Sequence, residues 1–287
     1  MILESCRRLT IGILMTMGVA GHGLVADENT GDETNTLAFR NLQRLVQEEE
    51  RILSHAREPD GTYDIEQVQR GFQDLVREYE VFLADNPDYA AGYVAYGLML
   101  DRAGETRIAS RMFMRADELD PEIPVVKNQL GNYMVENDRP VHALPYFLTA
   151  IELEPEEALY YYQLGNLLAE YRDEFLGRGM YEAAVLDEQL QKAFRKAREL
   201  TPDEIAYAYR YAESYYDVED PDWDAALEAW DSLTGRLRPG VELQTIYLQQ
   251  ANVHLLNDDP GKATELLENV TEPALQSNKE RLLERLP

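Results

Sequence analysis

Residues 90–121 read AAGYVAYGLMLDRAGETRIASRMFMRADELDP, and residues 124–155 read PVVKNQLGNYMVENDRPVHALPYFLTAIELEP. The second stretch repeats the first at a distance of 34 residues. Identical residue types recur at this distance: Pro87, Pro121 and Pro155; Gly97, Gly131 and Gly165; Ala109 and Ala143; Phe113 and Phe147; Ala116 and Ala150. Several residue types that share one period indicate an internal repeat, which is typical of a repeat architecture.

The spacing within one period predicts two short helices. Tyr93, Gly97 and Leu100 lie at i, i+4 and i+7, which places them on one face of a helix. The same spacing returns within residues 109–116, and Pro121 then ends the second helix. Since a single helix pair cannot bury its own apolar stripe, we expect the pairs to stack on one another.

These residues resemble the tetratricopeptide repeat family, whose units carry a bulky residue, Leu-Gly, Tyr, Ala, Phe, Ala and Pro in that order. The clear matches are residues 90–121, 124–155 and 158–202, and the third has an insertion at about 171–187. The matching residues, which we expect in the repeat core, are Tyr93, Gly97, Ala109, Phe113, Ala116, Pro121, Gly131, Ala143, Phe147, Ala150, Pro155, Gly165, Phe194, Ala197 and Pro202. The resemblance implies an all-α, right-handed superhelical solenoid of stacked antiparallel helix pairs.

Weaker units extend the solenoid in both directions. Residues 205–235 and 244–272 keep the helix faces of the pattern, and residues 274–287 form a charged segment that we expect to be a capping helix. Residues 36–87 are interpreted as a degenerate helix pair, with a turn at Asp60 and Gly61. The prediction is one solenoid of about five or six helix pairs over residues 36–286.

The N-terminus has the pattern of a secretory signal peptide. Arg7 and Arg8 precede an apolar run that ends near Gly21, and small residues follow up to Ala26. We expect residues 1–26 to be removed on export to the periplasm or the medium, although an uncleaved membrane anchor is the alternative. Residues 27–35 are interpreted as a disordered acidic lead-in.

The charge balance limits the classes of partner. The chain has 54 acidic and 27 basic residues, which gives a formal net charge of −27. A nucleic-acid-binding protein needs a basic patch, and an anionic membrane surface attracts basic segments. We therefore expect neither nucleic acid nor, after processing, direct membrane binding, and the sequence leaves the oligomeric state open.

The resemblance implies that the first helix of each pair lines a concave inner face. Residues at the exposed positions of that face are Asn128, Asn132, Tyr162, Asn166, Tyr209, Arg210, Glu213, Tyr216 and Asn252. Amide side chains both donate and accept hydrogen bonds, which suits an extended peptide backbone. The inner face also carries Glu136, Glu170 and Asp217, so we expect a neutral or basic peptide segment of a partner protein. The alternative is a polar face that is merely solvated.

No catalytic or cofactor motif stands out. The four histidines occur singly, the one cysteine is Cys6, and phosphate-loop and nucleophile-elbow patterns are absent. The acidic loop at 217–224 lacks the spacing of a calcium loop, and Asp222 is expected to cap a helix that begins near Trp223. We therefore expect no metal, no cofactor and a non-enzymatic adaptor. A structural assembly factor of an envelope complex, acting through its convex face or ends, is the alternative, and an enzyme is a remote one.

The sequence does not determine the local structure at two places, the insertion at 171–187 and the surroundings of Pro145. The insertion at 171–187 either lengthens both helices of its unit or forms a flap. Pro145 cannot donate the backbone hydrogen bond that a helix beginning at Pro140 would need from it. We expect that helix to begin late or to have an irregular first turn.

Overall fold

The fold is all-helical over the part of the chain that the computed structural model describes, which is residues 37–57 and 64–286. No strand occurs within those ranges. The predicted signal segment at 1–26 with Cys6, the lead-in at 27–35 and the turn at Asp60 and Gly61 lie outside the described residues. The predicted fold class, an all-α stack of helix pairs, is confirmed.

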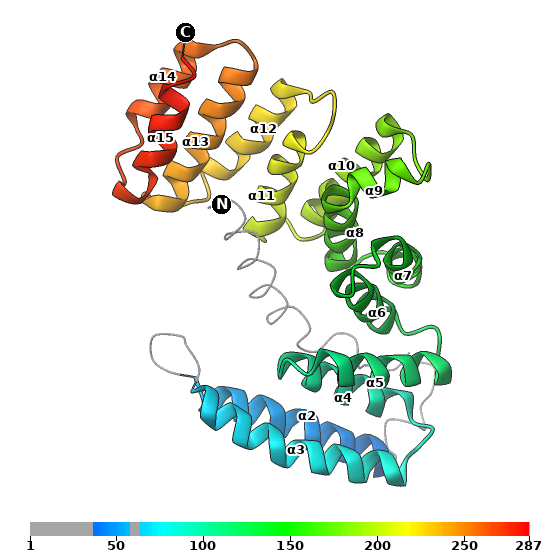
Figure 1. Ribbon diagram of the computed structural model, residues 1–287. Coiled ribbons are helices and arrows are strands. Elements are labelled where there is room, and N and C mark those ends of the chain that lie inside the picture. The colour runs from blue at the N-terminus through cyan, green and yellow to red at the C-terminus, as the bar shows by residue number, and fades with distance from the viewer. Residues whose placement is uncertain (1–36, 58–63, 287) are drawn as a thin grey trace. The chain divides into compact units, whose positions relative to one another are not determined.

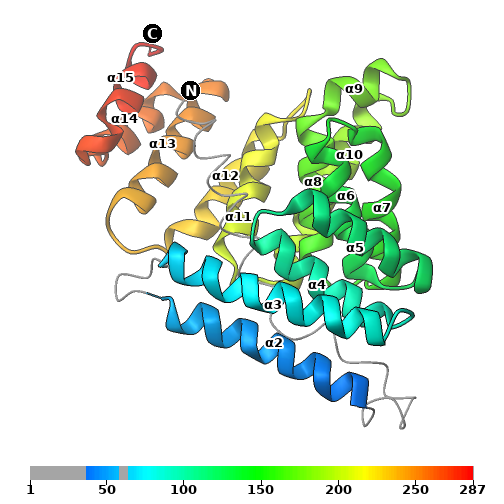
Figure 2. The ribbon, with the colours of Figure 1, turned by 60° about the horizontal axis from the view of Figure 1, so that its bottom comes forward.

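The described residues fall into two compact units, one up to Glu154 and one from Pro155 onward. The N-terminal unit contains three antiparallel helix pairs (Figure 1): α2 (Leu37–His55) with α3 (Ile65–Asp85), α4 (Ala90–Arg102) with α5 (Thr106–Leu119), and α6 (Pro124–Glu136) with α7 (Pro140–Leu153). Figure 2 shows α2 and α3 side by side along their length.

The C-terminal unit also contains three helix pairs, together with shorter elements. The pairs are α8 (Ala158–Glu170) with α10 (Ala183–Leu200), α11 (Ile205–Glu213) with α12 (Trp223–Thr234), and α13 (Val241–Leu256) with α14 (Pro260–Glu268). The shorter elements are α9 (Arg172–Gly177), the 3₁₀ turns η2 (Ser214–Tyr216) and η3 (Pro273–Leu275), and α15 (Gln276–Leu283). The N-cap predicted for α12 is confirmed, because Asp222 Oδ1 accepts a hydrogen bond of 3.0 Å from the Ala225 N–H.

A glycine–phenylalanine contact explains why these two residue types share the 34-residue period. A Cβ atom added to Gly97 would lie 2.6 Å from Cε1 of Phe113, so only glycine lets the ring pack against the first helix. The other pairs repeat this geometry at 2.7 Å: Gly131 with Phe147, and Gly165 with Phe194. Each ring is almost fully buried, and each contact joins the first helix of a pair to the second.

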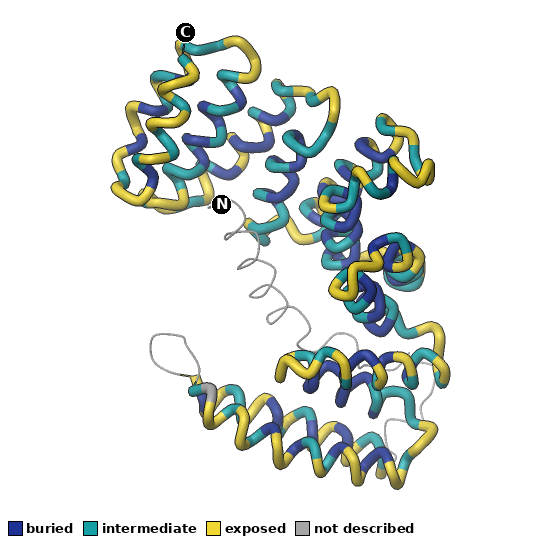
Figure 3. Tube along the Cα trace, in the orientation of Figure 1, coloured by how far each residue is buried: buried dark blue, intermediate teal, exposed yellow. Residues whose placement is uncertain are grey.

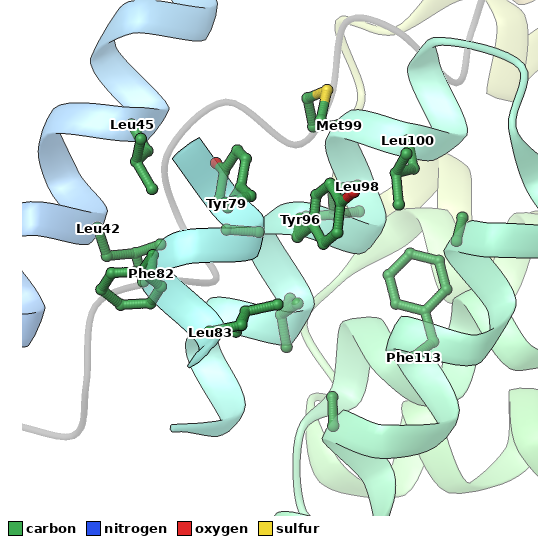
Figure 4. Close-up of a cluster of buried hydrophobic side chains, with 14 of the residues drawn as sticks. Leu42, Leu45, Tyr79, Phe82, Leu83, Tyr96, Leu98, Met99, Leu100 and Phe113 are labelled. Carbon is green, nitrogen blue, oxygen red and sulfur yellow. The ribbon is translucent and has the colours of Figure 1, made fainter. Parts of the chain in front are cut away.

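The core of the N-terminal unit continues from the degenerate helix pair into the first clear repeat. Figure 3 shows α4 buried along nearly all of its length, whereas α2 and α3 alternate between buried and exposed residues. Tyr79 of α3 stacks on Tyr96 of α4 with ring centroids 5.1 Å apart, and Phe82 lies beside Leu42 of α2 (Figure 4). These contacts make α2 and α3 part of the stack.

A buried ion pair also ties α2 to α4. The Glu49 side chain is only 3% exposed; its Oε1 accepts a hydrogen bond of 2.7 Å from Nε of Arg102 and lies 2.6 Å from Nη2. Burial raises the pKa of the Glu49 carboxyl, and the Arg102 charge opposes that rise. The carboxylate is therefore held in an apolar junction by one guanidinium.

Four of the residues expected in the repeat core lie at its edge. Pro121, Pro155 and Pro202 are exposed, because each follows the end of a second helix and stands in the turn. Tyr93 is partly buried, and its hydroxyl donates to the Pro87 carbonyl at 3.1 Å. The prolines mark the repeat by ending helices rather than by filling its interior.

The two open local features are settled by the structure. The helix α7 begins at Pro140, so a late start is wrong, and Pro145 lies inside it. The insertion neither simply lengthens α8 nor forms a bare flap, because it adds the short helix α9 before α10 begins. Phe175 of α9 is fully buried, and Arg172 holds Asp187 through two hydrogen bonds of 2.8 and 3.0 Å.

Candidate functional site

A small polar pocket lies among α4, α5 and α6 of the N-terminal unit. It has room for about one water molecule. Its lining residues are Asp101, Thr106, Ser110, Phe113, Gln129, Asn132, Tyr133 and Glu136. Asn132 is one of the inner-face residues expected from sequence, and its Nδ2 donates to Gln129 Oε1 at 3.0 Å.

Two carboxylates give this pocket its electrostatic character. Burial raises the pKa of the Asp101 carboxyl, although the Arg102 charge and a hydrogen bond from the Gln129 side chain oppose the rise. Burial also raises the pKa of the Glu136 carboxyl, and the nearby Asp101 charge adds to the effect. Among the described residues neither carboxylate forms an ion pair, since the neighbouring Arg102 is bound to Glu49. The pocket therefore carries two carboxylates without an ion-pair partner in the described part of the chain, although the charge of Arg102 acts on Asp101.

The sequence predicted Asn132 and Glu136 on the inner face, but it did not predict Asp101, Thr106 and Ser110 as parts of a site. Asp101 stands at the twelfth position of its repeat, which is an inner-face position, but that face was not assigned in the first clear unit. Thr106 and Ser110 belong to the second helix of the pair, where no inner-face position was expected. Applying the same positions to residues 90–121 would have found Asp101.

Asn128 does not lie on an open surface. It is only 2% exposed, and its Oδ1 has no hydrogen-bond partner among the described residues. The sequence placed it on the inner face because it stands at the fifth position of its repeat, but the packing of α6 covers it. Asn128 is therefore corrected from an accessible residue to a buried one.

Arg210 in the C-terminal unit is likewise buried, with a side chain 8% exposed. Its Nε donates to Oδ1 of Asn166 at 3.1 Å, and its Nη2 donates to Oδ2 of Asp217 at 2.7 Å. The carboxylate of Glu213 lies 3.7 Å from Nη1, and the guanidinium stands 4.3 Å from the centroid of the Phe194 ring. Arg210, the one cation expected on the inner face, is therefore already bound by residues of its own unit.

Asn166 is not equivalent to Asn132, although the two are 34 residues apart. Besides accepting from Arg210, Asn166 is hydrogen-bonded to the side chain of Tyr162. Tyr162 itself is 8% exposed and packs on Tyr207 at 4.9 Å, and burial raises the pKa of its phenol. Tyr162 is therefore, after Asn128 and Arg210, a third expected surface residue that the structure places in the interior.

The remaining inner-face residues of the C-terminal unit are partly buried and joined to one another. Gln249 Nε2 donates to the Tyr209 hydroxyl at 3.2 Å, and the Tyr216 hydroxyl donates to the Gln249 carbonyl at 3.1 Å. Arg285 Nη1 donates to Oδ1 of Asn252 at 2.5 Å. These bonds connect α11, α13 and the end of the chain.

The described residues contain neither a candidate metal site nor a candidate membrane-spanning helix. No group of three or more His, Cys, Asp or Glu side chains in residues 37–57 and 64–286 is placed to hold a metal ion. Across the same ranges, no helix combines the length and apolar character needed to cross a membrane.

Comparison with known proteins identifies the architecture. Neither the sequence profiles of protein families nor the curated protein sequences gave a match. Among solved structures, YrrB, described as a TPR protein with an unusual peptide-binding site, is 17% identical with a TM-score of 0.58, over 72% of this chain and 96% of that one. Pseudomonas aeruginosa PilF is 15% identical with a TM-score of 0.60, over 86% and 99% of the two chains. PilW, a type IV pilus biogenesis factor, is 13% identical with a TM-score of 0.56, over 87% and 99%.

Proposed function

We propose that this chain, whose fold is that of the tetratricopeptide repeat proteins, is a non-enzymatic scaffold that binds a neutral or basic peptide segment of a partner protein. The observation that carries the proposal is the pocket with the two carboxylates of Asp101 and Glu136, which form no ion pair within the described residues. The ammonium group at the end of a lysine side chain, which is close to a water molecule in size, would supply a cation to a pocket of this volume. Charge-assisted hydrogen bonds to a carboxylate are stronger than neutral ones.

The other groups of the pocket suit the backbone of such a segment. The Gln129 amide is already bonded to Asn132 and Asp101, but the Oδ1 atom of Asn132 can accept a hydrogen bond and the hydroxyl of Thr106 can donate and accept. An extended segment presents alternating N–H and C=O groups that these side chains can pair. An acidic tail is disfavoured as a ligand, because the pocket is negatively charged and the buried Arg210 is already paired with Asp217.

The fold comparison supports a partner-binding role in general terms. The description of YrrB names a peptide-binding site on a protein of this fold. Scaffolds of stacked helix pairs offer extended concave surfaces, on which such segments can lie.

The test uses the processed chain and two model peptides of equal length, one alternating glycine with lysine and one alternating glycine with glutamate. Isothermal titration should detect binding of the lysine peptide only. Asp101→Asn and Glu136→Gln should each weaken that binding about 10-fold, which corresponds to one charge-assisted contact. Glu152→Gln is the matched control, because it removes one exposed carboxylate from α7 outside the pocket. Equal affinity in all three variants would refute the pocket as the site.

A second candidate is an assembly factor of an envelope complex that acts through its convex face or its ends. PilW, which has this fold along nearly its whole length, is described as a pilus biogenesis factor. Size-exclusion chromatography with light scattering separates the two candidates for the isolated chain. A mass that rises with concentration favours self-assembly, and a constant monomer favours the adaptor.

Export is part of the proposal and rests on residues 1–26. The basic start, the apolar run and the small residues up to Ala26 are the motivating pattern. N-terminal sequencing of the protein from the producing cell should give Asp27 as the first residue. A chain that still begins at Met1 and sediments with membranes would instead indicate an uncleaved anchor.

A further inference from the structure

The surroundings of Arg210 have the composition of a binding site for a guanidinium group. Asn166 of α8 supplies an amide oxygen, Asp217 supplies a carboxylate at 2.7 Å, and Phe194 of α10 supplies an aromatic face at 4.3 Å. Guanidinium groups bind carboxylates through directed hydrogen bonds and stack on aromatic rings. Three separate elements of the C-terminal unit thus converge on one cation.

Charge attraction provides much of the binding of the Arg210 guanidinium. The Nη1 atom of Arg210 is buried and has no hydrogen-bond partner among the described residues, and the nearest carboxylate, that of Glu213, lies 3.7 Å away. A buried charge needs a partner, since taking it out of water costs several kcal/mol. Glu213 and Asp217 therefore lie beside a cation of their own unit, whereas Asp101 and Glu136 in the N-terminal unit have no ion pair in the described ranges.

We propose that Arg210 is a specificity-determining residue that fills, from within the chain, a cation site on the inner face of the C-terminal unit. With Arg210 in place, this face accepts neither a basic side chain, because the site is occupied, nor an acidic one, because the guanidinium is already paired. A basic residue of a bound segment is then recognised only in the pocket of the N-terminal unit. The proposal rests on the proposed function for its biological role, but the site itself can be tested separately.

The first experiment empties the site. Arg210→Ala leaves Asn166, Asp217 and Phe194 around a vacancy of the size of a guanidinium group. Methylguanidinium at about 10 mM should raise the melting temperature of the variant by at least about 2 °C, through binding to the folded state, and should leave the wild-type chain unchanged. Methylammonium, which lacks the planar fork, should have a smaller effect. Equal responses of the variant and the wild-type chain would overturn the proposal.

The second experiment measures specificity with the lysine and glutamate peptides. Arg210→Ala should gain at least about 5-fold in affinity for the lysine peptide, which is less than a full charge-assisted contact is worth. Arg210→Lys keeps the internal cation and should bind as the wild-type chain does. An unchanged affinity of Arg210→Ala would overturn the proposal.

If Arg210→Ala does not fold, a third variant tests the proposal. Asp217→Asn keeps the size of the side chain and removes one negative charge beside Arg210. It should gain at least about 5-fold in affinity for the glutamate peptide, and no gain would count against the proposal. Failure of the proposed function would look different: the wild-type chain would not bind the lysine peptide, whereas methylguanidinium would still stabilise Arg210→Ala.

Discussion

At the scale of the residue, the fold depends on positions where one side chain must be missing for another to fit. The three glycine–phenylalanine pairs are such positions, since a Cβ atom would approach the ring to 2.6–2.7 Å. The rings are 0–2% exposed, so they have no open space into which to move. Glycine and phenylalanine therefore recur together in the repeat because each ring occupies the space that a Cβ atom would fill.

Gly131→Ala should destabilise the protein although it replaces glycine in a helix. Overpacking against Phe147 costs about 1–3 kcal/mol, and the better helix propensity of alanine returns up to about 1 kcal/mol. We expect a net loss of about 1–2 kcal/mol in the free energy of unfolding, measured by urea denaturation. Gly177→Ala is the control, because nothing lies within 4 Å of its added Cβ atom, and it should be neutral or slightly stabilising. A neutral Gly131→Ala would contradict the steric explanation.

Binding of the lysine peptide should weaken on acidification. The pKa values of Asp101 and Glu136 lie above their ordinary values of 3.8 and 4.5, since burial disfavours the charged carboxylates. A cation prefers the ionised form, so affinity should be full well above both raised pKa values and fall as the pH decreases through them, beginning above pH 4.5. Titrations between pH 8 and pH 4.5 test this, with Asp101→Asn,Glu136→Gln as the variant that should lose the pH dependence. A flat profile for the wild-type chain would refute it.

At the scale of the element, α2 and α3 attach to the repeats through both apolar contacts and one buried charge. The stacked Tyr79 and Tyr96 rings join α3 to α4, and the Glu49–Arg102 ion pair joins α2 to α4. The weak repeat pattern of residues 36–87 did not predict this ion pair, because its partners are 53 residues apart and lie on separate helices. The docking of the degenerate pair is thus a property of the tertiary structure.

Arg102→Met should destabilise the docking of α2, because it leaves the Glu49 carboxylate buried without its cation. Removing one partner of a buried ion pair costs about 3 kcal/mol or more. Arg44→Met is the matched control: Arg44 and Glu78 form an ion pair whose side chains are 61% and 42% exposed. Its loss should cost less than about 1 kcal/mol. Thermal unfolding of both variants provides the comparison.

A second substitution tests the cause of that loss. Glu49→Gln in the Arg102→Met background removes the uncompensated charge and should restore part of the stability. The loss in Arg102→Met should also shrink on acidification, because the raised pKa of Glu49 means that the folded state takes up its proton first. A loss that neither Glu49→Gln nor low pH reduces would indicate lost packing of the Arg102 stem instead.

At the scale of the whole molecule, the charge of −27 opposes compaction. Exposed ion pairs in the described residues offset this repulsion only in part, since surface pairs are worth little. Charge repulsion acts over about 10 Å at 0.1 M salt and is screened further as salt is added. The excess of carboxylates is thus expected to lower the stability of the folded chain.

Added salt should therefore stabilise the chain. We expect the melting temperature to rise when sodium chloride is increased from about 0.02 M to 0.3 M, over which the screening length falls several-fold. Calorimetry at constant pH measures this, with an equal osmolality of glycerol as the control for solvent effects. A melting temperature that falls with salt would mean that favourable ion pairs, such as Arg102–Glu49 and Arg210–Asp217, outweigh the net repulsion.

The sequence by itself determined the all-helical architecture, the helix pairs and the contacts that repeat with them. Those features follow from periodic positions within 34 residues, where apolar spacing, glycine and proline each have a direct steric meaning. The mature-chain boundary proposed at Ala26 stays a prediction from the sequence.

Only the tertiary structure decided which polar inner-face residues are available to a ligand and which are bonded to other residues of the chain. The sequence treats Asn132 and Asn166 alike, yet Asn132 lines a pocket and Asn166 binds an arginine 44 residues away. Their availability depends on the charge and packing of neighbouring helices, because a polar side chain that finds an internal partner is lost to a ligand. The repeat period in the sequence determines the position of a side chain within its repeat. The residues of the neighbouring helices determine whether that side chain is available to bind a ligand.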